Sequence, residues 1–172
     1  MILLKVLLKN SACLIYINFT ISVAIKVTGH SGLNWTFYRY ADVLLLLSEV
    51  NWALRQLGEA ATDNDITKGI NEVRSRAGLP AYRSSDVNLL TIMSERAYEL
   101  IFENKMLWDQ RRTRMCLVEG NGQFSAIEHF IGHRPTDFSF SFSAMNLLSP
   151  ISGREIINNL QSTQNFGYLP RR

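Results

Sequence analysis

Three glutamates recur every four residues in the middle of the chain: Glu95, Glu99 and Glu103. On one α-helix this spacing puts the three carboxylates on a single face. Such a ladder could hold a metal ion, but no Glu-x-x-His sequence and no second carboxylate-bearing helix accompany it. Like charges in a row repel unless cations lie between them, and guanidinium groups pair well with carboxylates. We therefore expect structural ion pairs at these glutamates.

Arginines upstream and downstream of the ladder could supply the cations. Asp42 follows Arg39 by three residues on the same expected helix, so it could pair with Arg39 or with the later arginine-rich stretch. The expected network comprises Arg39, Asp42, Glu95, Arg96, Glu99, Glu103, Asp109, Arg111 and Arg112. With a formal net charge of only +3, the basic residues near Arg112 predict helix-end cations and no nucleic-acid partner.

The signatures of other chemistry are weak. His129 and His133 stand four residues apart and could offer two imidazoles to zinc on a helix, but Gly132 and Pro135 make a continued helix unfavourable. The two cysteines, Cys13 and Cys116, have no zinc or redox spacing. The sequence also has no Gly-x-Ser-x-Gly, phosphate loop or dinucleotide fingerprint. These observations predict a chain that is not an enzyme and binds no cofactor or metal.

Tryptophans are the candidates for contact with a sugar, because an aromatic face can lie flat against the apolar face of a sugar ring. Trp52 and Trp108 fall within helical patterns and are expected in the core. Trp35 lies in a loop flanked by Gly and Asn, which leaves a role in glycan binding open.

Helical periodicity dominates the elements that must position these groups. Residues 38–57 carry an apolar surface broad enough to require burial on more than one side. A second helix is expected over 65–77, with Asp63 or Asn64 as N-cap and Gly78 and Pro80 after its end. The two would form a hairpin of the tetratricopeptide kind. A third helix is expected from about 85 to 103 or beyond.

The sequence patterns at both ends of the chain differ from this helical periodicity. Residues 15–27 alternate strictly between apolar and polar side chains, which predicts an amphipathic strand; a lipid anchor at Cys13 is a competing interpretation. After Cys116 the chain is loop-rich, with alternating Phe138, Phe140 and Phe142, and a short helix is expected from Ser152. We expect a mainly α fold with an N-terminal strand or anchor over 1–33 and one helical domain over 34–172.

Several sequence motifs, in one order, resemble the C-terminal part of the SusD/RagB family. They are RYADVLL at 39–45, INEVRSRAGLP at 70–80, ERAYEL at 95–100, FE at 102–103, WDQRR at 108–112, and a closing segment with LSPIS at 148–152 and TQNFGY at 163–168.

The resemblance implies a binding protein of the outer membrane, surface-exposed and lipid-anchored. Such a protein captures an oligosaccharide or other nutrient and passes it to a TonB-dependent transporter of the SusC kind. The shared motifs are mostly scaffold, so the resemblance implies no particular binding residue. A helical adaptor for protein partners and a fragment without independent activity are the alternatives.

Overall fold

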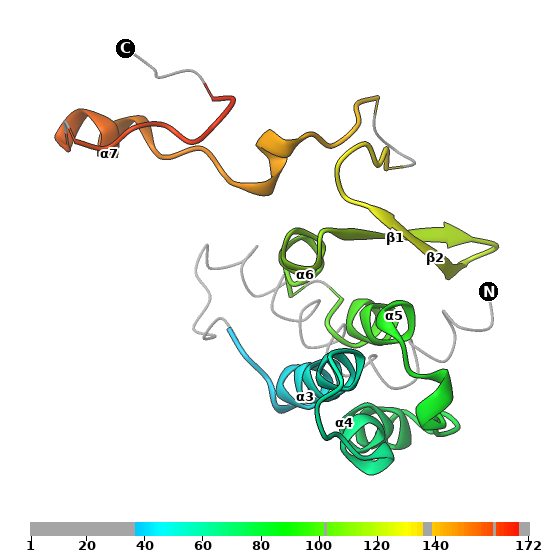
Figure 1. The fold of residues 1–172 in the computed structure, drawn as a ribbon. Coiled ribbons are helices and arrows are strands. Elements are labelled where there is room, and N and C mark those ends of the chain that lie inside the picture. Colours follow the sequence, from blue (N-terminus) through cyan, green and yellow to red (C-terminus); the bar gives the residue numbers. More distant parts are fainter. Residues whose placement is uncertain (1–36, 102, 136–138, 160, 169–172) are drawn as a thin grey trace, which may run out of the picture.

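The computed structural model of the chain describes residues 37–101, 103–135, 139–159 and 161–168. The predicted strand over 15–27, the anchor interpretation at Cys13 and the candidate Trp35 lie outside these residues. The described chain is mainly α, as predicted, and Figure 1 shows the helices over 40–56, 63–76 and 89–99 below a small sheet. Its elements are α3 (Tyr40–Gln56), α4 (Asp63–Arg76), a 3-10 turn (Ser84–Asp86), α5 (Leu89–Glu99), α6 (Met106–Thr113), β1 (Met115–Gly120), β2 (Gln123–His129), a second 3-10 turn (Ala144–Leu147) and α7 (Gly153–Asn158).

Helices α3 and α4 form the predicted hairpin. The N-cap of α4 is Thr62, one residue before the predicted caps, and it exchanges hydrogen bonds with Asp65 in a capping box. The two helices approach closely at Gly69, where a Cβ atom would lie 2.1 Å from the carbonyl oxygen of Leu44. Ser48 Oγ of α3 also accepts a hydrogen bond from the Ile70 N–H of α4 at 2.9 Å. Because Gly69 has no Cβ atom, the backbone of α4 can lie directly against the backbone of α3 at this point.

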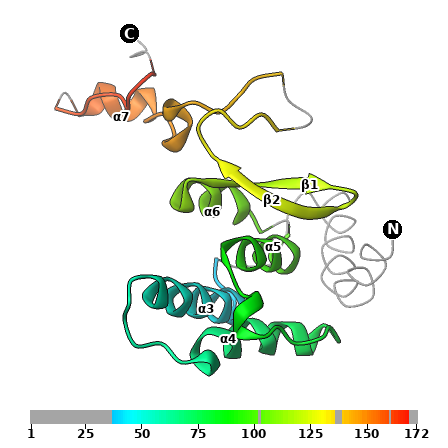
Figure 2. The ribbon, with the colours of Figure 1, turned by 45° about the vertical axis from the view of Figure 1, so that its right-hand side comes forward.

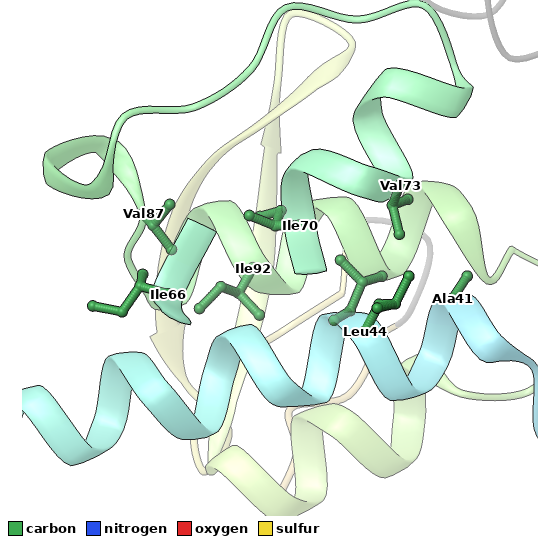
Figure 3. Packing of buried hydrophobic residues seen from close by; sticks show 8 residues of the cluster. Ala41, Leu44, Ile66, Ile70, Val73, Val87 and Ile92 are labelled. Atoms are coloured by element: carbon green, nitrogen blue, oxygen red, sulfur yellow. The ribbon is translucent and has the colours of Figure 1, made fainter. Parts of the chain in front are cut away.

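The main apolar core lies between this hairpin and α5. Ile92 of α5 and Val87 just before it meet side chains from both hairpin helices (Figure 3). Trp52 and Tyr82, which are partly buried, pack against this cluster. The cluster consists of Ala41, Leu44, Leu45, Ile66, Ile70, Val73, Val87 and Ile92. Burial of these side chains is what holds α3, α4 and α5 together.

Helix α5 also carries a second core on its other side. Met93 and Ala97 pack with Leu117 of β1, and Phe124 and Ile127 of β2 lie against them. In Figure 2, α5 accordingly lies between the α3–α4 hairpin and the β1–β2 ribbon. α5 is therefore the central layer of the fold, which explains why six consecutive residues of it, 92–97, are buried.

The third predicted helix, α5, is shorter than the range of about 85 to 103 that its sequence pattern predicted. It begins after Asn88, whose side chain accepts the Thr91 N–H, and its last residue is Glu99. Asn104 has a positive φ of 57°, so the chain turns sharply before α6 begins. Glu103 thus lies beyond the helix, and the prediction that all three glutamates share one helix face was wrong.

Residues after Cys116 contain an antiparallel hairpin that the expectation of a loop-rich stretch did not include. Strands β1 and β2 pair with Met115 opposite His129, and a register shift lies at Val118 and Glu119. Asn121 and Gly122 form the connection, with φ of 55° and 74°. Two positive φ values are what a type I′ turn requires.

The closing segment is held mainly by polar contacts within itself. Gln164 bonds the backbone of Ile151 in both directions, at 2.7 and 3.0 Å. Asn165 donates to the carbonyl of Ser149, and the Tyr168 hydroxyl donates to that of Leu148. The short helix expected from Ser152 is α7. Within the described ranges, no helix has both the length and the apolar character needed to span a bilayer.

Candidate functional site

The charged residues of the middle of the chain meet at the junction of α3, α5 and α6. Arg96 of α5 lies at the centre, only 4% exposed. Its Nη1 lies 2.8 Å from Asp42 Oδ1 of α3, and its Nε donates to Asp109 Oδ2 of α6 at 2.8 Å. Neither of the partners expected for Asp42, Arg39 or the later arginine-rich stretch, pairs with it here; its partners are Arg96 and, at 3.1 Å, Lys105.

Asp109 extends this junction to the surface. Its second oxygen accepts from Arg112 Nη2 at 3.0 Å, and the same guanidinium pairs with Glu49 of α3. The hydrogen bonds that Arg112 donates to Glu49 and Asp109 raise the pKa of its guanidinium above the ordinary value. α3 and α6 are therefore joined by a continuous chain of alternating charges.

A second branch links α3, α4 and α5 around Glu99. Arg39 lies 2.8 Å from both Glu99 Oε1 and Glu103 Oε1, and it also donates to the Glu99 carbonyl at 2.7 Å. Arg76 of α4 pairs with the same Glu99 oxygen. Glu99 and Glu103 do not share a helix face, but the guanidinium of Arg39 pairs with both of them.

Glu95 occupies a third, buried position. It pairs with Arg74 of α4, whose guanidinium carbon lies 3.8 Å from the ring centroid of Tyr82. The Tyr82 hydroxyl contributes a hydrogen bond to Glu95 at 3.3 Å. Burial raises the pKa of the Glu95 carboxyl more than the charge and hydrogen bond of Arg74 lower it.

The structure therefore pairs eight of the nine residues expected in the network, in three separate groups, and adds four partners. The additions are Glu49, Arg74, Arg76 and Lys105. Arg111 is not among the paired residues: it donates to Ser149 Oγ at 3.1 Å and lies beside the Trp108 ring. A carboxylate that is already matched by a guanidinium is a poor metal ligand. The described residues contain no cluster of acidic, His or Cys side chains suited to a metal.

The match to a family model covers almost the entire chain. The model of the SusD family matches residues 10–168. This chain belongs to the SusD family. A SusD superfamily protein from Parabacteroides distasonis ATCC 8503 has a solved structure that superimposes with a TM-score of 0.64 at 33% sequence identity over 82% of this chain.

A second solved structure, of a protein named BT4246, has 23% identity over 81% of this chain and a TM-score of 0.53, which shows the SusD fold alone. The chain spans 29% and 25% of the lengths of these two solved chains. No curated protein matches it.

One aromatic residue of this SusD chain is placed differently from its prediction. Trp108 was expected in the core, but it is 62% exposed on α6. The guanidinium carbon of Arg111 lies 5.7 Å from its ring centroid. The helical pattern misled here because α6 has only eight residues and its inward position is taken by Asp109, which Arg96 neutralises.

The two histidines considered for zinc are on different elements. His129 is the last residue of β2, whereas His133 follows a turn and pairs with Glu128 through Nδ1 at 3.1 Å. They therefore do not share the helix face that a two-histidine zinc site would need.

Replacing Glu99 tests the branch of the network that joins α3 to α4. We expect Glu99→Ala to reduce the free energy of unfolding by about 1–3 kcal/mol, because Arg39 and Arg76 both lose this carboxylate while Arg39 keeps Glu103. Urea denaturation followed by circular dichroism measures this loss. Glu72→Ala, at an exposed position of α4, is the control, and an equal effect of the two substitutions would contradict the structural role of Glu99.

The Asp42 carboxyl should make stability depend on pH. Burial opposes ionisation of Asp42, but Arg96 and Lys105 outweigh it and hold its pKa below the ordinary value of 3.8. A lowered folded-state pKa adds stability above the unfolded pKa, and this stability is lost as the pH falls through the folded value. The loss of unfolding free energy caused by Asp42→Asn should therefore be largest near neutral pH and become smaller below about pH 4. Urea titrations across this range measure it; a difference independent of pH would contradict the pairing.

Proposed function

We propose that this chain forms the C-terminal scaffold of a SusD-type protein that binds a glycan or other nutrient at the outer membrane. The observation that carries the proposal is the family match over residues 10–168. In this proposal residues 1–33 form the strand or anchor segment and 34–172 the helical domain. The protein acts by binding, without catalysis, and hands its ligand to a TonB-dependent transporter of the SusC kind.

The proposed place of sugar contact includes Trp108. Its indole is exposed, and Arg111 lies beside it with a donor for sugar hydroxyls. Aromatic rings with a polar neighbour suit ligands that have one apolar and one wet face, as a pyranose does. Trp35 remains a second candidate, and it lies outside the described residues.

Binding of the purified chain to a panel of soluble polysaccharides tests this function. A bound glycan should raise the melting temperature followed by circular dichroism, because it binds only the folded state. Trp108→Ala should weaken binding about five- to tenfold, as expected for a lost contact of roughly 1 kcal/mol.

The matched control for that experiment is Phe166→Ala. It removes another exposed aromatic ring, 78% exposed, from the closing segment. Equal weakening by both substitutions would contradict the proposed place of contact, and no binding to any polysaccharide would contradict glycan capture by this chain.

A protein-binding role is the second candidate function, because one face of α3 is apolar and exposed.

A further inference from the structure

The turn between β1 and β2 holds Asn121-Gly122, the one place in the sequence where a glycine follows an asparagine. Both residues are exposed, and the turn projects beyond α5 in both ribbon views (Figures 1 and 2). The side-chain carbonyl carbon of an asparagine is an electrophile, and the main-chain nitrogen of the next residue is a nucleophile within reach of it. The tip of the hairpin therefore carries a reactive pair as well as a turn.

The reaction open to this pair is ring closure followed by hydrolysis. The Gly122 nitrogen attacks Cγ of Asn121 and loses its proton, and the side-chain nitrogen leaves as ammonia. A bond from that nitrogen to Cγ thus replaces the bond from Nδ2 to Cγ, which gives a five-membered succinimide. Water then opens the ring. Attack of water at Cγ gives an aspartate, and attack at the main-chain carbonyl carbon gives an isoaspartate, in which the main chain runs through Cγ.

The local structure leaves both reacting groups free. Gly122 has no Cβ atom that would obstruct the approach of its nitrogen. Within the part of the chain that the structure describes, neither the Gly122 N–H nor the Asn121 carboxamide has a hydrogen-bond partner. Exposure gives water access to the ring once it has formed. The electrophile, the nucleophile and the second reactant are therefore all available at the turn.

Other asparagines of the chain lack this combination. Asn64 is also exposed, but it lies in α4, and the N–H that follows it, that of Asp65, donates to Thr62 Oγ1 at 3.1 Å. The carboxamide of Asn165 donates to a carbonyl of the closing segment at 2.7 Å. A hydrogen bond to either reacting group holds it away from the geometry of attack. Asn64 is thus a built-in reference for an exposed asparagine whose following amide is occupied.

We infer that Asn121 is a site of spontaneous deamidation, at which the folded chain is converted by water alone into aspartate and isoaspartate forms. The succinimide ring fixes ψ of Asn121 away from the value of a type I′ turn, so the turn must open before the ring closes. Exposed turns open locally at a much lower free energy than the whole chain unfolds. The reaction therefore proceeds in the folded chain, more slowly than in the unfolded one.

The two products should differ in their effect on the fold. Asp-Gly forms the same two-residue turn as Asn-Gly, so the aspartate form keeps the hairpin and gains one negative charge. An isoaspartate adds a methylene to the main chain inside the turn, so Gly120 and Gln123 no longer lie opposite each other. Leu117 and Ile127 hold this hairpin against α5, and a disturbed register would loosen that core. Only the isoaspartate form should be destabilised.

The test follows the folded 172-residue chain during incubation in mildly alkaline buffer. Peptide mass spectrometry locates the mass increase at each asparagine, and electron-transfer fragmentation distinguishes aspartate from isoaspartate. We expect conversion at Asn121 to be at least about tenfold faster than at Asn64, because glycine leaves the attacking nitrogen unobstructed. After separation by ion exchange, the isoaspartate form should melt at a lower temperature than the parent chain, and the aspartate form at the same temperature.

Three variants isolate the cause. Asn121→Asp installs one product directly and should keep the melting temperature of the parent chain. Asn121→Gln would need a six-membered ring, which closes far less readily, so conversion at this position should stop. Gly122→Asp places a side chain beside the attacking nitrogen, and aspartate tolerates a positive φ, so conversion should slow about tenfold without loss of the turn.

The inference is overturned if Asn121 converts no faster than Asn64, or if Gly122→Asp leaves the rate at Asn121 unchanged. A melting temperature of Asn121→Asp as low as that of the isoaspartate form would contradict the role of the added main-chain methylene. No glycan is present in these experiments, so their outcome is independent of the proposed binding function.

Discussion

Gly69→Ala is expected to disrupt the α3–α4 hairpin. In an exposed helix this change stabilises by about 1 kcal/mol, because alanine is the better helix former. Here the added Cβ would lie 2.1 Å from the Leu44 carbonyl oxygen and 2.9 Å from Ser48 Oγ. The first contact is with backbone, so α3 and α4 must separate, and their movement would open the core around Ile70 and break its hydrogen bond with Ser48. We expect the free energy of unfolding to fall by at least about 3 kcal/mol.

Urea denaturation followed by far-ultraviolet circular dichroism measures that effect. Lys68→Ala, one residue earlier and exposed, is the control and should change stability by less than about 0.5 kcal/mol. If the Gly69 variant were as stable as the parent chain, the two helices could not approach as closely as the structure indicates.

Arg96→Met is the second change with a large expected effect. The methionine fills much of the same space, but the buried carboxylates of Asp42 and Asp109 lose the guanidinium that they share. Removing one partner from a buried charge cluster typically costs about 3–5 kcal/mol. The same urea experiment should show this loss, and the midpoint of thermal unfolding should fall accordingly.

The cause can be isolated by neutralising the stranded carboxylates. Without Arg96, Asp42 keeps only Lys105 and Asp109 keeps only Arg112, so both carboxylates are less fully compensated. Asp42→Asn and Asp109→Asn, added to Arg96→Met, remove this charge and should restore part of the lost stability. Arg83→Met, at an exposed position, is the control for loss of an arginine as such. No recovery in the triple variant would mean that packing, and not charge, accounts for the effect of Arg96.

Helices α3 and α4 were predictable because their apolar residues repeat with helical spacing over about three turns or more. The extent of α5 was not, because Glu95, Glu99 and Glu103 continue the spacing beyond the point where the helix ends. The decisive feature is local: the C-cap Leu100 leaves the helical region with φ −105° and ψ 22°, and the chain then turns to reach Asn104 at a positive φ.

The β1–β2 hairpin carried a signal that the sequence analysis did not use. Asn121-Gly122 is the dipeptide most typical of a two-residue β-turn, and apolar residues flank it on both sides. The glycines nearby suggested loops instead. A sheet of only two strands is stable here because Leu117 and Ile127 pack on α5.

The ion pairs were predictable as a class but not in their partners. Carboxylates at helical spacing require cations, and Arg39, Arg96 and Arg112 were identified. Arg74 and Arg76 were not, because their role depends on how α4 lies against α5, which sequence spacing does not encode. Exposure of Trp108 was missed for the same reason.

The pairing of Asp42 with Arg96 also determines an order of events during folding. The two residues are 54 positions apart, whereas α3 and α4 are neighbours along the chain. On a ribosome the α3–α4 hairpin therefore emerges while Asp42 is still hydrated. The Asp42 carboxylate can be buried only after α5, which carries Arg96, has been synthesised. We expect the charge cluster to form after the folding transition state, so that it slows unfolding more than it speeds folding.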